Sequence, residues 1–396
     1  MTAPRTTLRA RTLPLRATTP DDEARWAELV DRALEPNPFL SPAYLATAAR
    51  HLPEARDVVL VVVEDVDRMR ALLPLSRDAS TAGATSATTA GPFLAHDSPL
   101  CAPLIDRDDA DATLDALLAH LRSRANGFPG LVDLTLVPGD GPLWEALHRA
   151  CARNRVGVLE RSRFERAVLR RADGAPDPRA ALSTARRKQV DRMQRRLERE
   201  AGPLEVTDRG GDPDGFEEFV RLEAAGWKGT TEHGGALAVV PGRAEWFRDV
   251  AAGLRERGNL VVLRVTAGGE TVFVSVLLRA GRSLYCLMDT YDERFARCSP
   301  GTVGRVLEQE FCLEQTDAEL LDPCLHPTNV LPTGLYRDRR PLVGLVLGTR
   351  PRARALLLLV RARRRLRDLR PRRDDHRPGA SPAARSREAD PDGLDR

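Results

Sequence analysis

Polar and glycine residues follow a buried strand in the C-terminal half of the chain. Leu284 to Met288 are apolar and predict that strand, and residues 289–298 form a polar elbow after it. A helix is expected to begin at Pro300, because proline suits the first helical position and the Ser299 hydroxyl can cap the helix. Free N–H groups at a helix start favour an anion, above all phosphate. The pattern indicates a nucleotide or coenzyme pyrophosphate site, although an ordinary capped helix has the same pattern.

Side chains that can carry a proton lie on this strand and after it. Tyr291, at the strand end, could return a proton to a leaving group, and Tyr285 is the alternative. A second short strand is predicted at residues 319–322, beside the first. The candidates for a general base are Asp289, Asp292, Glu293, Asp322 and His326. Each of them also fits the commoner role of capping a turn or bonding to the backbone.

Composition places the chain among globular proteins. Its 396 residues are enough for two domains, and 42% hydrophobic with 30% charged residues is ordinary. No segment approaches the run of about twenty apolar residues that spans a bilayer, and the N-terminus lacks the apolar core of a signal peptide. The six cysteines lack the spacing of a metal site, so we expect no bound metal. These features predict a cytoplasmic protein.

The positive charge of the chain lies in its tail. Residues 350–373 hold eleven arginines against Asp368, for a charge of +10, and residues 374–396 sum to −2. The whole chain has a charge of +4, so residues 1–349 sum to −4. Residues 350–373 are predicted to form a basic amphipathic helix, because apolar residues recur there at helical spacing: Ala355, Leu359, Ala362, Leu366 and Leu369. Such a helix can lie on anionic lipid, bind RNA or dock on the protein's own body.

Helices and strands of both halves are predicted from the apolar pattern. Residues 1–20 and 374–396 are expected to be disordered. The segment 171–178 is rich in Pro, Gly and Asp, so we place a domain boundary there, between halves at residues 21–170 and 179–349. The second half opens with a basic helix at 179–200, followed by three neighbouring antiparallel strands and the helix at Pro300. These elements predict an α+β fold with a mixed, mostly antiparallel sheet.

Residues 272–311 resemble the core of the GNAT acyl-CoA N-acyltransferase fold. More narrowly, the chain resembles the branch of cellulose-biosynthesis (CelD-like) acetyltransferases and FemAB-like aminoacyl transferases. The resemblance covers about residues 20–347 and implies two GNAT-like halves in tandem. Its motifs are WAELV with NPFLSPAYL near the start, the basic RRKQVDRMQRRLE helix, LEAAGWKG at Leu222–Gly229 and YDERFARCSPG at Tyr291–Gly301.

This resemblance implies coenzyme A or acetyl-CoA as the acyl donor, with its pyrophosphate at the helix start. The family's loop often reads Arg/Gln-x-x-Gly-x-Gly/Ala, and Arg297 to Thr302 keep the arginine and one glycine at a shifted spacing. The implied coenzyme-binding residues are Arg297, Ser299, Gly301, Thr302 and Gly304. The resemblance also assigns four residues to the acceptor side of the cleft: Glu223, Trp227, Lys228 and Gly229. For catalysis we select Asp322, Tyr291 and Asp292.

The predicted function is transfer of an acetyl or other acyl group from acyl-CoA to an amine or hydroxyl acceptor. The acceptor is expected to be a small molecule or glycan precursor of cell-envelope or exopolysaccharide metabolism. Two alternatives stay open: a FemAB-like enzyme with an aminoacyl-tRNA donor, and a non-catalytic adaptor whose arginine-rich tail contacts membrane or nucleic acid. Membrane-surface contact through residues 350–373 is the expected peripheral interaction, and nucleic acid is the less favoured partner.

Overall fold

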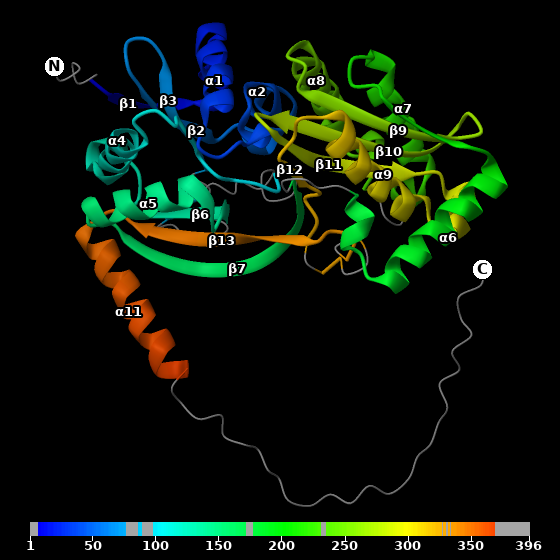
Figure 1. Cartoon of the computed structure of the whole chain (residues 1–396). Helices are drawn as coiled ribbons and strands as arrows, with labels where there is room; N and C mark the ends of the chain where they lie inside the picture. Colours follow the sequence, from blue (N-terminus) through cyan, green and yellow to red (C-terminus); the bar gives the residue numbers. More distant parts are fainter. Residues whose placement is uncertain are drawn as a thin grey trace, which may run out of the picture.

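Most of the helices and strands of the first half, but not all, form where the apolar pattern predicts them. The computed structural model describes residues 7–76, 86–88, 98–171, 177–230, 235–326, 328–329, 332 and 334–368 (Figure 1). The predicted disordered tail at 374–396 lies outside these residues. The helices of the first half are α1 (Pro20–Arg32), α2 (Pro42–His51), α4 (Ala110–Arg122) and α5 (Gly141–Arg153). Its strands are β1 (Arg9–Pro14), β2 (Val58–Glu64), β3 (Met69–Ser76), β4 (Ser86–Thr88), β5 (Leu104–Ile105), β6 (Leu131–Pro138) and β7 (Gly157–Arg170).

The N-terminal strand β1 corrects the expectation that residues 1–20 are disordered. It pairs antiparallel with β2, from Arg9 opposite Glu64 to Pro14 opposite Val59. The charged residues of this segment do not form the apolar pattern from which a strand is predicted. An edge strand nevertheless tolerates charged side chains. Arg11 lies 2.6 Å from the carboxylate of Asp22 and 2.7 Å from that of Glu64, so ion pairs fasten this edge to α1 and β2.

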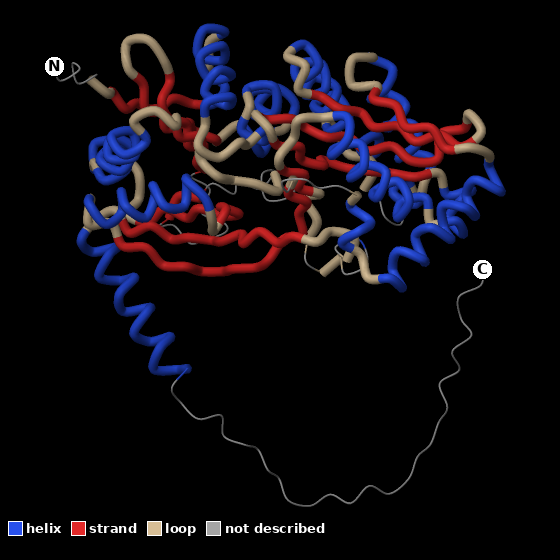
Figure 2. Tube along the Cα trace, viewed as in Figure 1, coloured by secondary structure: helices blue, strands red, loops and turns tan. Residues whose placement is uncertain are grey.

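The second half supplies the elements that surround the candidate site. Its helices are α6 (Thr184–Ala201), α7 (Pro213–Ala225), α8 (Arg243–Glu256), α9 (Pro300–Gln315) and α11 (Pro351–Asp368), and α9 begins at the predicted proline. Its strands are β8 (Leu204–Asp208), β9 (Leu260–Ala267), β10 (Glu270–Ala280), β11 (Ser283–Tyr291), β12 (Leu320–Asp322) and β13 (Asp338–Gly348). Figure 2 shows strands on both sides of the molecule with helices around them, which confirms the α+β fold.

One long strand, β7, joins the two sides of the sheet. The strand order is β1-β2-β3-β4-β6-β13-β7-β12-β11-β10-β9-β8, with β5 paired to β3. The curved β7 pairs with β13 along most of its length and with β12 at residues 169–170 (Figure 1). The pairs β4–β6 and β11–β12 are parallel and the others antiparallel, so the sheet is mixed and mostly antiparallel, as predicted. Strand β13 belongs to the second half in sequence but lies between β6 and β7 of the first half, so the division at residues 171–178 stays a proposal.

Helix α11 follows β13 directly and confirms the predicted helix over residues 351–368. It contacts β7 and β13 near its start, and its far end extends away from the sheet (Figure 1). The side chain that docks is Leu357, which is 4% exposed. The predicted apolar stripe points the other way, since Leu359 is 60% and Leu366 64% exposed. Among the described residues, no helix is long and apolar enough to cross a membrane.

Candidate active site

The candidate site begins where β11 and β12 separate. The two parallel strands pair only from Ser283 opposite Leu320 to Tyr285 opposite Asp322. Strand β11 continues to Tyr291, so residues 286–291 have no neighbouring strand on that edge among the described residues. The pairing of β11 with β10 shifts at the same place, which leaves Leu287 as an extra, bulged residue. An open edge next to a bulge can accept an extended ligand through backbone hydrogen bonds.

A cavity of 410 Å³ lies beside this edge. The bulged Leu287 and its neighbour Met288 line it from β11. The opposite walls come from both halves of the chain and consist of Ser98, Pro99, Leu136, Phe164, Arg166, Phe247, Cys324 and His326. A mainly apolar pocket with a few polar groups is the usual form of a small-molecule site.

Two polar groups in the cavity wall lack hydrogen-bond partners. Within the described residues, Arg166 Nε and Ser98 Oγ are buried and unpaired. The Arg166 side chain comes from β7, is 3% exposed as a residue and has its guanidinium carbon 6.0 Å from the centre of the Phe164 ring. An unpaired buried donor costs about 1–3 kcal/mol, so its presence in a ligand-sized cavity points to a partner that arrives with the ligand.

Asp322 holds this arginine in place. The predicted catalytic carboxylate is fully buried, and its Oδ2 lies 3.4 Å from Arg166 Nη1. Its other oxygen accepts a hydrogen bond from the backbone N–H of Cys324 at 2.8 Å. Asp322 itself does not line the cavity, so it acts on the site through Arg166.

His326, one of the base candidates, lies on the cavity wall. Its Nδ1 is 2.8 Å from the Thr328 hydroxyl, and its ring centre is 5.7 Å from that of Phe164. The hydroxyl and the aromatic ring orient the imidazole. The backbone N–H of Thr328 also donates to Nδ1, at 3.4 Å, which favours the neutral tautomer with its proton on Nε2. Among the described residues no partner is found for Nε2, so this nitrogen is open to a ligand.

The helix start at α9 differs from the prediction in one respect. Ser299 stands at the N-cap position, but its hydroxyl makes no capping hydrogen bond. Its φ of 55° is left-handed, which turns the side chain away from the first-turn N–H groups. The N–H groups of Thr302 and Val303 bond instead to the Ser299 carbonyl at 3.0 and 3.2 Å. The Gly301 N–H has no such partner within the described part of the chain, so it is the group open to an anion.

A carboxylate side chain of the protein already lies beside the start of α9. Glu200, from α6, lies 2.9 Å from Arg297 Nε and 3.1 Å from the Cys298 thiol. Hydrogen bonds from Arg196, and from Cys298 and Arg297, lower the pKa of Glu200 to about 2. The predicted phosphate-binding Arg297 is therefore paired in this structure, and a phosphate would have to share it with Glu200.

The two glycines of α9 have different neighbours. A Cβ on Gly301 would lie 3.3 Å from the Tyr291 ring. Because Gly301 has no side chain, the first turn of α9 can lie close to the end of β11. A Cβ on Gly304 would overlap the ring of Phe273 in β10. Gly304 therefore permits close packing of the helix on the sheet.

The predicted catalytic residues are not brought together. Tyr285 pairs with Asp322, and Tyr291 is six residues further along β11, a separation of about 20 Å. Tyr291 packs at the start of α9. Asp292 caps the following 3-10 helix η8 (Glu293–Cys298) and pairs with Arg294 at 2.6 Å. Burial alone would raise the pKa of Asp292, but the hydrogen bonds from Arg294 lower it, which makes this carboxylate a weak base.

The residues predicted on the acceptor side gather beside β11. The Lys228 ammonium lies 3.2 Å from Glu223 Oε1 and 3.2 Å from the backbone carbonyl of Asp289. Glu223 is buried and also accepts the Leu237 N–H at 2.9 Å, so it holds the loop in place. A Cβ on Gly229 would overlap the Ala224 carbonyl, which makes that glycine a requirement of the turn. Trp227, 47% exposed, is the one side chain of the four that presents a large surface to solvent.

A buried polar network supports β11 from the α9 side. Glu308 is fully buried, accepts a hydrogen bond from the Ser275 hydroxyl and lies 3.5 Å from the Tyr336 hydroxyl. Burial raises the pKa of Glu308 to about 7, although Arg305 and Ser275 act in the opposite direction. Arg305 pairs with Asp289 at 2.7 Å. This network fixes α9 against the strand that borders the cavity.

Sequence reasoning missed Arg166, Ser98 and Phe164. They come from segments more than a hundred residues before β11, and nothing in their local pattern distinguishes them from other strand or loop residues. Among the described residues, no group of three or more His, Cys, Asp or Glu side chains is placed to hold a metal ion.

Comparison with known proteins finds one family match, within the second half. Residues 184–319 match the acetyltransferase (GNAT) domain family, whereas no curated protein matches the chain. Among solved structures, the chain is similar to FemX, with 10% identity, a TM-score of 0.52 and coverage of 88% of this chain and 99% of FemX. The C-terminal domain of a putative lysylphosphatidylglycerol synthetase from Agrobacterium fabrum has 13% identity, a TM-score of 0.48 and coverage of 86% and 95%. At such identities the likeness to FemX shows a shared fold.

Proposed function

We propose that the chain transfers an acyl group from acyl-CoA to an amine or hydroxyl acceptor, because residues 184–319 match the acetyltransferase (GNAT) domain family. The observation that carries this proposal is the cavity at the open edge of β11, where Arg166 Nε and Ser98 Oγ are buried in the wall and have no partner among the described residues. A thioester carbonyl and an acceptor would meet there. The resemblance to CelD-like proteins supports a small-molecule or glycan-precursor acceptor of envelope or exopolysaccharide metabolism.

The open edge of β11 suits an extended donor. The pantetheine arm of coenzyme A carries amide groups that can pair with strand backbone, as an added strand does. The far end of the same edge meets the α9 start, where the Gly301 N–H and Arg297 can face a pyrophosphate. Ser299, Thr302 and Tyr291 surround this point. Of the predicted coenzyme residues we therefore keep Arg297, Ser299, Gly301 and Thr302, and assign Gly304 to packing.

The side chains of the cavity can supply the groups that acyl transfer requires. Bound acyl-CoA supplies an acyl group activated as a thioester. An alkyl amine must lose a proton to attack, and the His326 imidazole in the cavity wall is the side chain that we assign to its removal. Arg166 Nε, held by Asp322, can donate to the carbonyl oxygen as negative charge develops on it. The bond from acceptor to acyl carbon forms, the carbon–sulfur bond breaks, and solvent returns a proton to the departing thiolate.

We assign Asp322 a positioning role and place Tyr291 and Asp292 at the phosphate end of the donor. On the acceptor side, Trp227 and Lys228 are proposed to contact the incoming molecule, with Glu223 and Gly229 shaping the loop that carries them. Trp227 offers exposed aromatic surface, which suits the apolar face of a sugar ring or another flat group.

An aminoacyl-tRNA donor is the second candidate, favoured by one surface. The basic helix α6 exposes Arg187, Lys188, Arg192, Arg195 and Arg199, which have no carboxylate at ion-pair distance among the described residues. Such a surface can bind RNA phosphates, with an affinity that falls steeply with salt. The match to a GNAT acetyltransferase domain favours acyl-CoA over this donor and an enzyme over an adaptor.

Titration calorimetry with coenzyme A and acetyl-CoA tests the proposal. The informative pair of variants is Ser299→Asp and Ser299→Asn, because both residue types tolerate the left-handed backbone at this position. They have the same shape, and only aspartate adds a negative charge at the helix start. We expect wild type and Ser299→Asn to bind coenzyme A alike, and Ser299→Asp to bind at least about tenfold more weakly.

Two other results would change the proposal. Equal affinity of the two variants would remove the α9 start from the donor site. Binding of tRNA without binding of coenzyme A, lost in Arg187→Gln/Arg192→Gln, would replace the acyl-CoA donor with the aminoacyl-tRNA donor.

A further inference from the structure

The first turns of α11 are fixed firmly to the protein. Leu357 is buried against the sheet, and three glycines let the helix approach closely. A Cβ on Gly157 would lie 3.3 Å from the Arg354 Cα, and one on Gly348 would lie 3.0 Å from the Arg354 backbone nitrogen. A Cβ on Gly130 would lie 3.2 Å from that of Ala353. The direction in which the remaining faces of α11 point is therefore set by the fold.

The outward face of α11, defined by Leu356, Leu358, Leu359 and Leu366, is apolar and uncovered. These side chains are 48%, 54%, 60% and 64% exposed, in that order. They account for four of the seven large apolar side chains that are exposed in the described part of the chain. Concentration of so much apolar surface on one projecting helix marks it as an interaction surface.

Arginines lie among the leucines of the outward face as well as beside it, since Arg363 is four residues after Leu359 and three before Leu366. Helix α11 contains seven arginines and one aspartate, Asp368, for a charge of +6. Arg361 and Arg364 donate to the backbone carbonyls of Val158 and Glu160 on β7. Arg352, Arg363 and Arg365 have no carboxylate within ion-pair distance among the described residues, and all three are exposed. The outward face thus combines apolar side chains with free positive charge.

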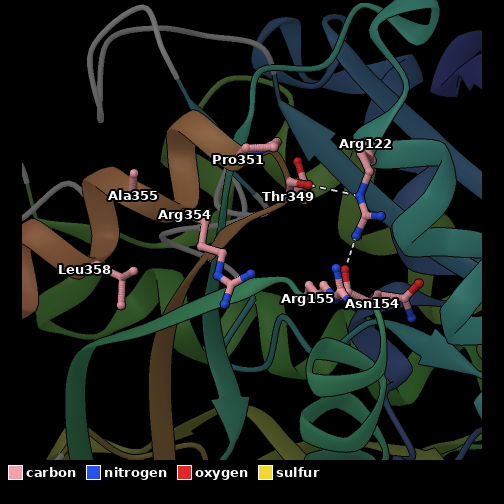
Figure 3. Close-up of a pocket in the computed structure, with 8 residues that line it drawn as sticks. All are labelled: Arg122, Asn154, Arg155, Thr349, Pro351, Arg354, Ala355 and Leu358. Atoms are coloured by element: carbon pink, nitrogen blue, oxygen red, sulfur yellow. Dashed lines mark hydrogen bonds between the residues drawn. The ribbon is translucent and has the colours of Figure 1, made fainter.

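A pocket of 410 Å³ opens beside the first turns of the helix (Figure 3). Its walls include Pro351, Ala355 and Leu358 of α11 and the turn at Asn154 and Arg155. Figure 3 shows Arg122 bridging this turn and Thr349, where it donates to the Thr349 carbonyl at 3.1 Å and to the Asn154 carbonyl. Arg155 and Arg354 have no such partners within the described residues. The pocket therefore offers two uncompensated guanidinium groups next to an apolar wall.

We propose that α11 and this pocket dock the protein on an anionic phospholipid bilayer. The leucines of the outward face enter the boundary between headgroups and acyl chains, as in interfacial helices. The arginines lie at the level of the lipid phosphates, and Arg155 with Arg354 receives one headgroup phosphate in the pocket. RNA would use the arginines but has no partner for four exposed leucines. This interaction is separate from acyl transfer and does not depend on the proposed donor or acceptor.

Sedimentation of the full chain with vesicles tests the proposal. One set of vesicles contains phosphatidylglycerol and phosphatidylcholine in equal parts, and the other contains phosphatidylcholine alone. We expect binding to the first set, with little binding to the second. Leu359→Ser/Leu366→Ser and Arg155→Gln/Arg354→Gln should each lower the partition coefficient at least about tenfold.

Two matched control variants distinguish binding through the outward face from nonspecific hydrophobic or electrostatic binding of vesicles. Val66→Ser/Val239→Ser removes two exposed apolar side chains elsewhere, and Arg187→Gln/Arg192→Gln removes two exposed charges from α6. Both should bind vesicles as wild type does, and thermal melts should show all variants folded.

Three results would overturn the proposal. The first is no binding to the anionic vesicles, and the second is wild-type binding by the leucine variant. In the third, light scattering would show that the leucine variant converts an oligomer into a monomer, so that a second copy of the chain covers the outward face.

Discussion

The buried carboxyl of Glu308 should make the stability of this protein depend on pH. Burial raises its pKa from an ordinary 4.5 to about 7. Below pH 4.5 both the folded and the unfolded chain hold the proton. As the pH rises from 4.5 towards 7, the unfolded chain releases the proton while the folded chain retains it. The unfolded state then binds fewer protons than the folded state, so stability falls with rising pH.

The size of this effect follows from the two pKa values. Between pH 5 and pH 8 the free energy of unfolding should fall by about 2–3 kcal/mol on account of Glu308 alone. Glu308→Gln cannot ionise, but its amide oxygen can still accept the hydrogen bond from Ser275 or Tyr336. The variant should therefore lose about 2–3 kcal/mol less than wild type over the same interval.

Urea denaturation at pH 5 and pH 8, followed by tryptophan fluorescence, measures the difference. Comparing the two proteins cancels the other titrating groups, which are common to both. Glu314→Gln is the matched control, because Glu314 lies exposed on the same helix and should leave the pH dependence unchanged. If wild type and Glu308→Gln lose the same stability between the two pH values, the reasoning about this carboxyl is refuted.

Two further predictions concern packing and charge within the fold. Gly304→Ala should destabilise the protein by about 1–3 kcal/mol, because the new methyl group overlaps Phe273. The control Gly211→Ala places its methyl group in open space and should cost less than about 1 kcal/mol. Equal melting temperatures of the two variants would contradict this prediction. Glu35→Ala should cost about 3–5 kcal/mol in urea denaturation, because it leaves the buried Arg340 with only the more distant carboxylate of Asp140, 3.6 Å from its Nε. A loss below about 1 kcal/mol, as expected of an exposed ion pair, would show that Arg340 finds another partner.

Local structure could be predicted well from this sequence. The start of α9 at Pro300, the strand pair β2 and β3 and the helix α11 all follow from apolar spacing and proline position. Strand β7 runs from Gly157, whereas the apolar pattern predicts a strand only at residues 164–169. Residues 160–163 are exposed, three of the four are charged, and they lack a strand-like apolar pattern. The pairing of β13 with β6 and β7 is a long-range contact, which the local spacing of apolar residues cannot predict.

The candidate site was predicted only in part, for the same reason. The segment at the end of β11 could be identified because glycine, proline and arginine cluster within a few residues. The backbone conformation of Ser299 and the contact of Gly304 with Phe273 depend on three-dimensional packing. Arg166 is separated from Asp322 by 156 positions, so only the fold shows that the two form a pair.

The central claim is that an acyl donor lies along the open edge of β11, and amide hydrogen exchange tests it most directly. Exchange would be measured by mass spectrometry on the full chain, with and without acetyl-CoA. The account predicts slower exchange at residues 286–291 and at the α9 start when acetyl-CoA is present, with no change in α11. Binding of acetyl-CoA that leaves residues 286–291 exchanging at the same rate would contradict it.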